Sequence, residues 1–178
     1  MKTTDFRTDV LPQKDKIFRL ALRITLDRSE AEDIAQETLI RIWEKRDEWH
    51  QIENMEAYSL TIARRLALDH TKSLANKSHD RSYGTKSEEE TIGNEVRQTA
   101  DSTPLPDEQL DQRQRLGIIR NLIDQLPEVQ RTIMLLRDIE GHRYDKIAQV
   151  TSLSETQVKV YLHRARTKVR EALTRMKM

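Results

Sequence analysis

The 178-residue sequence contains no cysteine and few glycine, proline or aromatic residues. The absence of cysteine excludes disulfide bonds and thiolate metal sites, and it suits a protein of the cytoplasm. No apolar run approaches the roughly 18 residues that a membrane-spanning helix needs, and the first residues lack a signal-peptide core. Four glycines and four prolines beside 34% charged residues favour helices with small aliphatic cores. We therefore expect an all-α, cytoplasmic protein.

Motifs for catalysis and for metal binding are equally scarce. The five histidines never pair with each other or with a glutamate at a metal-ligand spacing such as HExxH. A glycine-rich phosphate loop is missing, because Gly84, Gly93, Gly117 and Gly141 stand isolated. The sequence thus predicts no enzyme, no metal or other cofactor and no small-molecule substrate.

Charge is segregated along the chain, although the net charge is only +1. Residues 154–178 contain seven Lys and Arg against two Glu, a local net charge of +5. Residues 78–112 contain nine Asp and Glu against three Lys and Arg, a local net charge of −6. Such segregation is typical of a nucleic-acid-binding face next to an acidic linker.

Helical periodicity divides the chain into two parts. Residues 1–75 show helical patterns that break near Asp27-Arg28 and again between His50 and Asn54, and periodicity resumes over residues 112–178. The intervening residues 76–111 are rich in Ser, Thr, Gly, Glu and Pro and have too little apolar material to bury, so they predict a flexible acidic linker. We expect two small helical domains joined by this linker.

Residues 144–168 (YDKIAQVTSLSETQVKVYLHRARTK) hold the most informative local pattern. A short helical stretch over residues 144–149 precedes residues 150–153, which are enough only for a tight turn. Ser154 is then a good N-cap for a second, basic helix. Two short helices joined by a turn, with the second one basic, predict a helix-turn-helix that places its second helix in a DNA major groove.

The basic helix has two predicted faces. Amphipathic spacing assigns its core stripe to Val158, Leu162, Ala165, Val169 and Leu173. The opposite arc and its flanks consist of Thr156, Gln157, Lys159, Val160, His163, Arg164, Thr167 and Arg170. Gln157 can pair with an adenine, Arg164 with a guanine or a phosphate, and Val160 with a thymine methyl group. The alternative for the basic positions is a solvated charged face.

Ser29 to Glu32 forms a capping-box pattern, which predicts that a helix starts with Ser29 as its cap. The predicted core face of this helix consists of Ala31, Ala35, Thr38, Leu39 and Ile42. The other face is polar but includes Ile40 and Trp43, and large apolar side chains at such positions often mark an interface. The alternative is that Trp43 packs against a neighbouring helix.

The next helix is predicted from about Met55 to Thr71. Its core side is assigned to Met55, Ile62, Ala63 and Leu66. Another flank combines the aromatic ring of Tyr58, the hydroxyl of Thr61 and the guanidinium of Arg65, with Arg64 nearby. Such groups one turn apart suit stacking on unpaired bases and holding phosphates, whereas the alternative is an ordinary solvated helix face.

Three segments of the chain resemble one protein family. Residues 31–43 (AEDIAQETLIRIW) closely resemble the second conserved region of sigma factors, the initiation subunits of bacterial RNA polymerase. Residues 57–69 (AYSLTIARRLALD) resemble the promoter-melting helix of the small extracytoplasmic-function (ECF) branch of the sigma-70 family. Leu126-Pro127, residues 131–141 and the helix-turn-helix resemble the fourth region of that branch. The blocks occur in the family's order, so the resemblance is specific.

The resemblance implies a role for each face. The face that docks on the clamp helices of the polymerase's largest subunit matches Asp33, Gln36, Glu37, Ile40 and Arg41. The contacts to the unstacked minus-ten element match Asn54, Tyr58, Thr61, Arg64 and Arg65, with Asn54 in the loop that captures a flipped base. The helix that reads the minus-thirty-five element matches Ser154, Thr156, Gln157, Lys159, Val160, Tyr161, His163 and Arg164. Further implied partners are promoter DNA, the flap of the second-largest subunit and an anti-sigma factor.

By this resemblance, the chain is expected to be an alternative sigma factor with sigma region 2 in residues 1–75 and region 4 in residues 112–178. Two alternatives remain. A free-standing helix-turn-helix regulator would need a ligand pocket or a dimer interface in the N-terminal domain. A helical adaptor that binds only proteins would leave the basic C-terminal segment and the exposed Val160 without a role.

Overall fold

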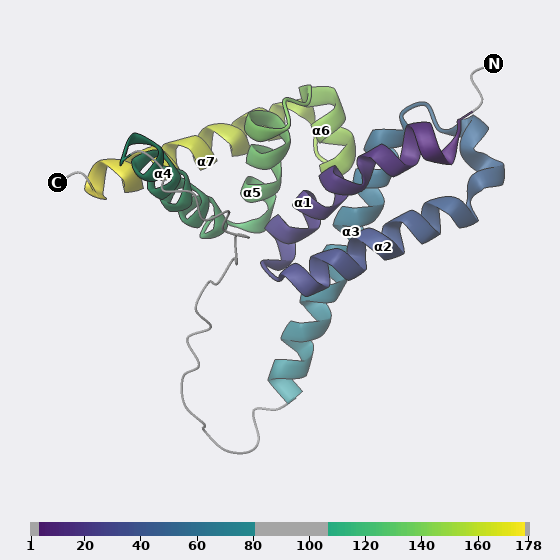
Figure 1. Ribbon diagram of the computed structural model, residues 1–178, viewed down its shortest axis with the longest axis horizontal. Helices are drawn as coiled ribbons and strands as arrows, with labels where there is room; N and C mark the ends of the chain where they lie inside the picture. The colour runs from purple at the N-terminus through teal and green to yellow at the C-terminus, as the bar shows by residue number, and fades with distance from the viewer. Residues whose placement is uncertain (1–3, 81–106, 177–178) are drawn as a thin grey trace.

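The computed structural model describes residues 4–80 and 107–176. Every regular element in these residues is helical, which confirms the all-α fold (Figure 1). The N-terminal half, residues 4–80, contains α1 (Lys14–Thr25), α2 (Arg28–Glu44) and α3 (Met55–Asp80), with the short turns η1 (Phe6–Val10), η2 (Leu11–Gln13) and η3 (Arg46–Gln51). The C-terminal half, residues 107–176, contains α4 (Asp107–Asp124), α5 (Glu128–Met134), η4 (Leu135–Ile139), α6 (Tyr144–Thr151) and α7 (Glu155–Met176).

Helix α2 begins at a different cap from the predicted one. Asp27 has an extended backbone, and its side chain accepts a hydrogen bond of 2.9 Å from the backbone N–H of Glu30. The prediction of Ser29 as the cap is wrong, because Glu32 pairs with Arg28 at 3.1 Å instead of closing a box with Ser29. The predicted core face is confirmed: Ala31, Ala35, Thr38 and Ile42 are buried, and Leu39 is partly buried.

Helix α3 is longer than predicted and buries a different face. It continues past Thr71 to Asp80, and α4 starts at Asp107, so helices extend into both ends of the predicted linker. The rest of that linker, residues 81–106, lies outside the described residues. The most buried apolar residues of α3 are Ala57, Leu60, Ala63 and Ala67. Ala63 is thus confirmed as a core residue, whereas the other predicted core residues, Met55, Ile62 and Leu66, are only partly buried.

The burial of α3 is explained by close packing between the two halves. Helix α1 packs against α5, and α3 packs against α6. Figure 1 shows α1 between α5 and the other helices of the N-terminal half. One apolar cluster contains Leu20 and Leu60 from the N-terminal half with Ile133, Leu136 and Ile147 from the C-terminal half, each at most 1% exposed. The two domains therefore share a core.

A smaller apolar cluster packs η1, the N-terminal turn, against α2. Val10 and Ile42 are fully buried there beside Trp49. The ring centroids of Phe6 and Trp43 lie 5.3 Å apart, and those of Trp43 and Trp49 lie 6.2 Å apart, both in edge-on geometry. Trp43 thus packs on neighbouring aromatic rings, as the alternative interpretation expected, while 48% of the residue remains exposed.

Candidate nucleic-acid and protein-binding surfaces

The helix-turn-helix consists of α6, a three-residue turn and α7. Helix α6 is two residues longer than predicted and ends at Thr151, whose hydroxyl donates a 2.7 Å hydrogen bond to the carbonyl of Ile147. Ser152 then takes a left-handed conformation with φ of 57°, which reverses the chain direction at some cost in strain for a residue with a Cβ. The backbone N–H of Leu153 closes the turn on the carbonyl of Ala148 at 3.1 Å.

Ser154 is confirmed as the N-cap of α7 and takes part in a reciprocal capping box. Its hydroxyl accepts a 3.1 Å hydrogen bond from the backbone N–H of Gln157. The side-chain oxygen of Gln157 in turn accepts a 3.0 Å hydrogen bond from the backbone N–H of Ser154. This pairing satisfies two backbone donors at the helix start. A contact between Gln157 and an adenine must therefore share or replace the cap bond.

The two predicted faces of α7 are confirmed. Val158, Leu162, Ala165 and Val169 are buried, and Leu173 is partly buried. The predicted arc is exposed at Thr156, Gln157, Lys159, Val160, His163, Arg164 and Arg170, and only Thr167 is partly buried. Tyr161, beside this arc, is also partly buried and packs against the shared core. The ring of Tyr161 therefore supports the helix as well as bordering its exposed arc.

Tyr144, at the start of α6, contacts two cations, Lys159 from the predicted exposed arc and Arg137, which the sequence analysis did not single out. The guanidinium carbon of Arg137 lies 4.5 Å from the centroid of the Tyr144 ring, and the ammonium nitrogen of Lys159 lies 5.2 Å from it. Cations over an aromatic face are stabilised by the ring quadrupole. The ring therefore fixes a basic group from η4 beside a basic group of α7.

Helix α2 carries the face that was predicted to bind a protein. All five predicted residues, Asp33, Gln36, Glu37, Ile40 and Arg41, are exposed and follow the spacing of one helix face. Nε of Arg41 lies 2.7 Å from Oε1 of Glu37, and Ile40 is 53% exposed between charged neighbours. This mixed apolar and charged face is therefore available to a protein partner.

Asn54, Tyr58 and Thr61 all make contacts within the N-terminal half. The side-chain oxygen of Asn54 accepts a 3.0 Å hydrogen bond from the backbone N–H of Ala57 and caps α3, while the residue stays exposed. Tyr58 is partly buried against the cluster that contains Trp49. The hydroxyl of Thr61 donates to the carbonyl of Ala57 at 2.7 Å. Each side chain thus already has a structural role.

Arg64 and Arg65 lie in different surroundings. Arg65 is exposed, but the side chain of Arg64 is only 14% exposed and its Nη2 lies 3.3 Å from Oε2 of Glu128 in the C-terminal half. Arg64 is therefore paired with α5, whereas Arg65, the next residue of α3, faces solvent.

The ion pairs between the halves were missed by the sequence analysis. Those formed by Arg and Lys are Arg19–Glu140 at 2.5 Å, Arg23–Asp124 at 2.5 Å, Arg64–Glu128 at 3.3 Å and Lys146–Glu56. The paired residues stand 64 to 121 positions apart in the sequence. Helical periodicity reports only neighbours within a few turns, so it contains no signal for these pairs.

Glu56 is the centre of one charged group at this contact. It accepts hydrogen bonds from Lys146 and from Lys16, the latter at 2.6 Å, and its Oε1 lies 3.7 Å from Nε2 of His142. Burial by itself raises the pKa of Glu56, but the two lysine hydrogen bonds outweigh burial and hold that pKa below its ordinary value. Burial, and then the charge of Lys146, lower the pKa of His142.

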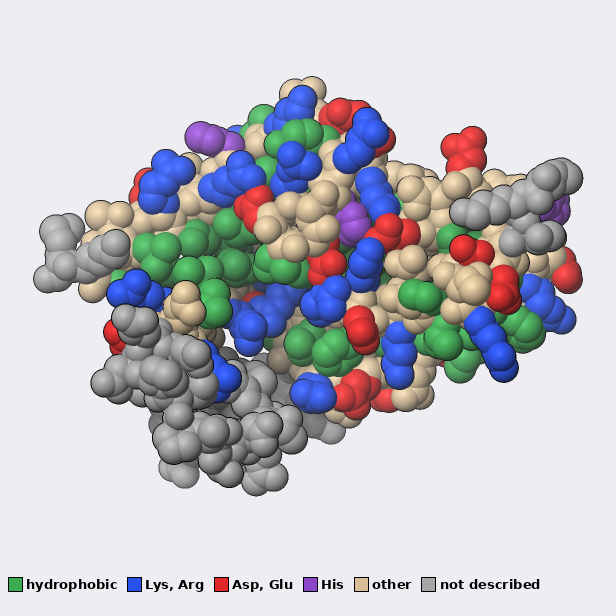
Figure 2. Space-filling view, turned by 45° about the horizontal axis from the view of Figure 1, so that its top comes forward, with side chains coloured by type: hydrophobic (Ala, Val, Ile, Leu, Met, Phe, Trp, Pro, Cys, Tyr) green, Lys and Arg blue, Asp and Glu red, His purple; other side chains and the backbone are tan. Residues whose placement is uncertain are grey.

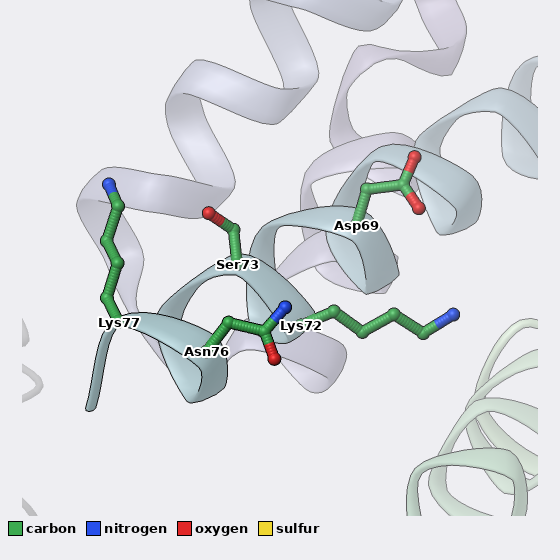
Figure 3. A pocket seen from close by; sticks show the side chains of 5 residues that line it. All are labelled: Asp69, Lys72, Ser73, Asn76 and Lys77. Atoms are coloured by element: carbon green, nitrogen blue, oxygen red, sulfur yellow. The ribbon is translucent and has the colours of Figure 1, made fainter. Parts of the chain in front are cut away.

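The described residues show no site suited to a metal ion, in that no three or more of their His, Asp and Glu side chains come together as ligands could. Within the same residues, no helix is both long and apolar enough to cross a membrane. A depression on α3 is lined by Asp69, Lys72, Ser73, Asn76 and Lys77. Figure 3 shows that these side chains spread in different directions from one helix, so they do not converge on a ligand.

Comparison with protein families covers both halves of the molecule. Residues 12–76 match the family described as Sigma-70 region 2, and residues 116–169 match the one described as Sigma-70, region 4. The first match spans α1, α2 and most of α3, and the second runs from the middle of α4 into α7. The chain belongs to the sigma-70 family.

Two curated relatives sharpen this assignment of the sigma-70 chain. It is 32% identical over 160 residues to a probable RNA polymerase sigma factor, RfaY, of Xanthomonas campestris pv. campestris, covering 90% of this chain and 38% of RfaY. It is 27% identical over 162 residues to the ECF RNA polymerase sigma factor SigE of Mycolicibacterium smegmatis, covering 90% of this chain and 58% of SigE. The chain therefore spans less than two thirds of the length of either relative. The name of SigE places the similarity in the ECF branch.

A solved structure has the same fold as this sigma-70 chain. It is the sigma factor RpoE of Bartonella quintana, in complex with the anti-sigma factor NepR. The two chains superpose with a TM-score of 0.71 at 23% sequence identity, over 96% of this chain and 97% of RpoE. The two helical domains are thus common to both proteins.

Proposed function

We propose that this chain is an alternative sigma factor of the ECF type, which binds core RNA polymerase and directs promoter-specific initiation of transcription. The observation that supports this most strongly is that one chain carries both matched sigma-70 regions, each with an exposed face of its own. The chemistry of RNA synthesis belongs to the polymerase. The sigma-70 chain selects the promoter and opens its strands in the cytoplasm, where the polymerase works.

The face of α2 around Ile40 is proposed to dock on the clamp helices of the polymerase's largest subunit. Ile40 supplies an apolar contact, and Asp33, Gln36, Glu37 and Arg41 form a polar rim around it. Exposed aliphatic residues with polar rims are the usual form of a transient protein interface. The C-terminal half is proposed to contact the flap of the second-largest subunit.

The exposed arc of α7 is proposed to read the minus-thirty-five element as duplex DNA. The capped N-terminus of α7 and the first exposed turns, from Thr156 to Arg164, suit entry into a major groove. Lys159 and Arg164 supply positive charge for phosphates or guanine, and Val160 supplies an apolar contact for a thymine methyl group. Ser154 positions this surface through its cap.

Helix α3 and the turn before it are proposed to hold the unstacked minus-ten strand. Asn54 is exposed in the turn before α3, and Arg65 is exposed on α3 directly after Arg64. Tyr58 and Thr61 complete a group with an aromatic ring, a hydroxyl and two guanidinium groups, a combination that suits single-stranded nucleic acid. An anti-sigma factor is a further proposed partner, because RpoE of similar fold was solved with one.

Run-off transcription tests the proposed function directly. Purified bacterial core polymerase is supplied with a library of randomised promoters, with and without this chain. We expect transcripts enriched for a paired upstream and downstream motif only when the chain is present. Failure to stimulate transcription, together with duplex binding by the chain alone, would instead identify a free-standing helix-turn-helix regulator.

The polymerase contact has a test of its own. The double substitution Gln36→Ala with Ile40→Ala should weaken binding to core polymerase at least about tenfold, since apolar and hydrogen-bonding contacts at the centre of an interface are lost. Circular dichroism should stay unchanged because both residues are exposed. Leu74→Ala with Asn76→Ala, two exposed changes near the end of α3, is the matched control. Equal affinities of the double variant and the control would remove the assignment of this face.

A further inference from the structure

An acidic face of the C-terminal half meets arginines of the N-terminal half. Asp124 at the end of α4 pairs with Arg23, and Glu128 in the first turn of α5 pairs with Arg64. Glu140, directly after η4, pairs with Arg19 through two hydrogen bonds of 2.5 and 3.1 Å. Three carboxylates from three elements of the C-terminal half thus each meet one guanidinium of α1 or α3.

A fourth pair across the same contact has the opposite polarity. Here the carboxylate, Glu56, comes from the N-terminal half, and Lys146 of α6 supplies the cation. Both side chains are less than a fifth exposed. A shift of one half along the other would bring like charges together, which is unfavourable. The reversed pair therefore specifies the register in which the halves meet.

Two of these ion pairs lie at the ends of the side of α3 that the C-terminal half covers. Glu56, Leu60 and Arg64 follow each other at intervals of four residues and so lie on one stripe of the helix. The two ends of this stripe bind Lys146 and Glu128, and Leu60 between them is 1% exposed in the shared core. A nucleic-acid strand cannot reach this stripe while the halves are packed together.

The arginine–carboxylate pairs between the halves resemble contacts between arginine and a DNA phosphate. Arginine binds carboxylates and phosphates through the same donors and with similar geometry. Arg64 is both a proposed ligand of the minus-ten strand and the partner of Glu128. Figure 2 shows that Lys and Arg side chains lie interleaved with Asp and Glu on one face of the molecule, instead of forming one uninterrupted basic patch.

We propose that this arrangement is a closed state of the free protein, in which Asp124, Glu128 and Glu140 pair with Arg23, Arg64 and Arg19, and Glu128 holds Arg64 in place of a DNA phosphate. The inference rests on the proposed function and adds its regulation. The polymerase-binding face of α2 and the duplex-binding arc of α7 stay exposed in the closed state. Contact with polymerase or duplex DNA can therefore come first. Arg64, the residue of the proposed single-stranded site that pairs with Glu128, becomes available only when the halves separate.

A distance measurement on the free chain tests closure. Because the sequence has no cysteine, Ser29→Cys in α2 and Gln149→Cys in α6, both at exposed positions, can be spin-labelled without background. We expect pulsed electron spin resonance to give one narrow distance that does not depend on protein concentration. A broad distribution of long distances overturns the closed state. A distance that appears only at high concentration overturns it as well, since the contact then joins two copies of the chain.

Charge reversal tests how closure is maintained. Asp124→Arg with Glu140→Arg places like charges opposite Arg23 and Arg19, so the distance distribution should broaden. Binding to a randomised single-stranded DNA oligonucleotide should tighten at least about fivefold. The matched control is Asp111→Arg with Glu171→Arg, which makes the same charge change at exposed positions. Equal DNA affinity of the two variants overturns the proposed covering of α3.

Two further measurements keep the test valid if the reversed variant folds poorly. Adding Arg19→Glu and Arg23→Glu restores opposite charges and should narrow the distance distribution again. For the unmodified sequence apart from the label sites, raising NaCl from about 0.05 to about 0.5 M should increase the open fraction by screening the partly exposed pairs. A salt-independent distance overturns the ionic basis of closure. These experiments contain no polymerase, so their outcome is separate from that of the transcription assay.

Discussion

The two helices proposed to contact DNA, α3 and α7, are presented in different ways. Helix α7 exposes its arc around Val160 and buries only the opposite stripe. Helix α3 has Arg64 paired with Glu128, Tyr58 packed in an aromatic cluster and Leu60 in a core shared by both halves. The helix for duplex DNA is thus ready to bind, while the helix for a single strand is partly covered. This difference is consistent with an order in which duplex contact precedes strand capture.

The largest expected effect comes from removing the shared core under α3. Leu60→Ala should lower the free energy of unfolding by about 2–5 kcal/mol, the usual cost of such a buried truncation. Because Leu60 belongs to a cluster with residues of both halves, urea denaturation should still show one transition, shifted for both halves together. Leu74→Ala, at a 52% exposed position of α3, is the control and should change stability by about 0.5 kcal/mol at most. Loss of only N-terminal structure in the Leu60 variant would contradict the shared core.

A smaller effect is expected from the cap of the exposed helix. Ser154→Ala removes the hydroxyl that accepts from Gln157 and should cost about 1 kcal/mol of stability, as N-cap truncations usually do. Affinity for minus-thirty-five duplex should fall with it, because the first turn of α7 loses its fixed position. Ser29→Ala, an exposed serine in the first turn of α2 that is not the cap, should leave both quantities unchanged. If the two serine variants were equally stable, the capping box would have no energetic role.

The proposed thymine contact should have a similar or smaller effect. Val160→Ala should weaken binding to the native promoter by about 1 kcal/mol or less, the low end for a contact to a base. Fluorescence anisotropy with duplex DNA measures this loss. It should vanish on a promoter in which every thymine of the upstream element has been replaced. An equal loss on both promoters would show that Val160 contacts no thymine methyl group.

The smallest expected effect is a pH dependence of closure through His142. The groups that face this imidazole are Lys146, Glu56, Lys16 and Glu140. Burial, and then Lys146, lower the pKa of His142 in the closed state, so the closed state favours the neutral ring. Once the halves separate, the pKa returns toward about 6.5, and the open state takes up the proton first. Closure is therefore fully favoured above that pH and weakens as the pH falls through it.

Glu56 acts in the same direction only at lower pH, because its lysine partners hold its pKa below the ordinary value of a glutamate carboxyl. The labelled chain should thus show a larger open fraction at pH 5.5 than at pH 7.5, and this change should disappear in His142→Gln. A larger closed fraction at pH 5.5 would reverse the sign and refute the role of His142.

Local features of the fold were predictable from the sequence, because they depend on neighbouring residues. The cap at Ser154 and the buried stripe of α7 follow from residues within a few positions of one another. The start of α2 was placed at Ser29 instead of Asp27, because both positions carry a residue type that can cap a helix. Only the structure shows that Glu32 turns toward Arg28.

The buried face of α3 could not be predicted in the same way. The periodicity of α3 is blurred because α1, α2 and α6 all pack against it, so a two-faced pattern does not describe it. The pairing of Arg23 with Asp124 joins residues 101 positions apart. Such a contact depends on how complete helices dock, which the spacing of side chains within one helix does not determine.

The aromatic cluster at the N-terminal turn gives the protein an internal optical probe. The sequence has two tryptophans, Trp43 and Trp49, and their rings meet beside the α2 face. All tryptophan emission therefore originates from one place in the N-terminal half. Docking of a polymerase fragment on α2 should change this emission directly, whereas duplex DNA bound to α7 alone should leave it nearly constant. The two binding events can thus be distinguished in solution without attaching a dye.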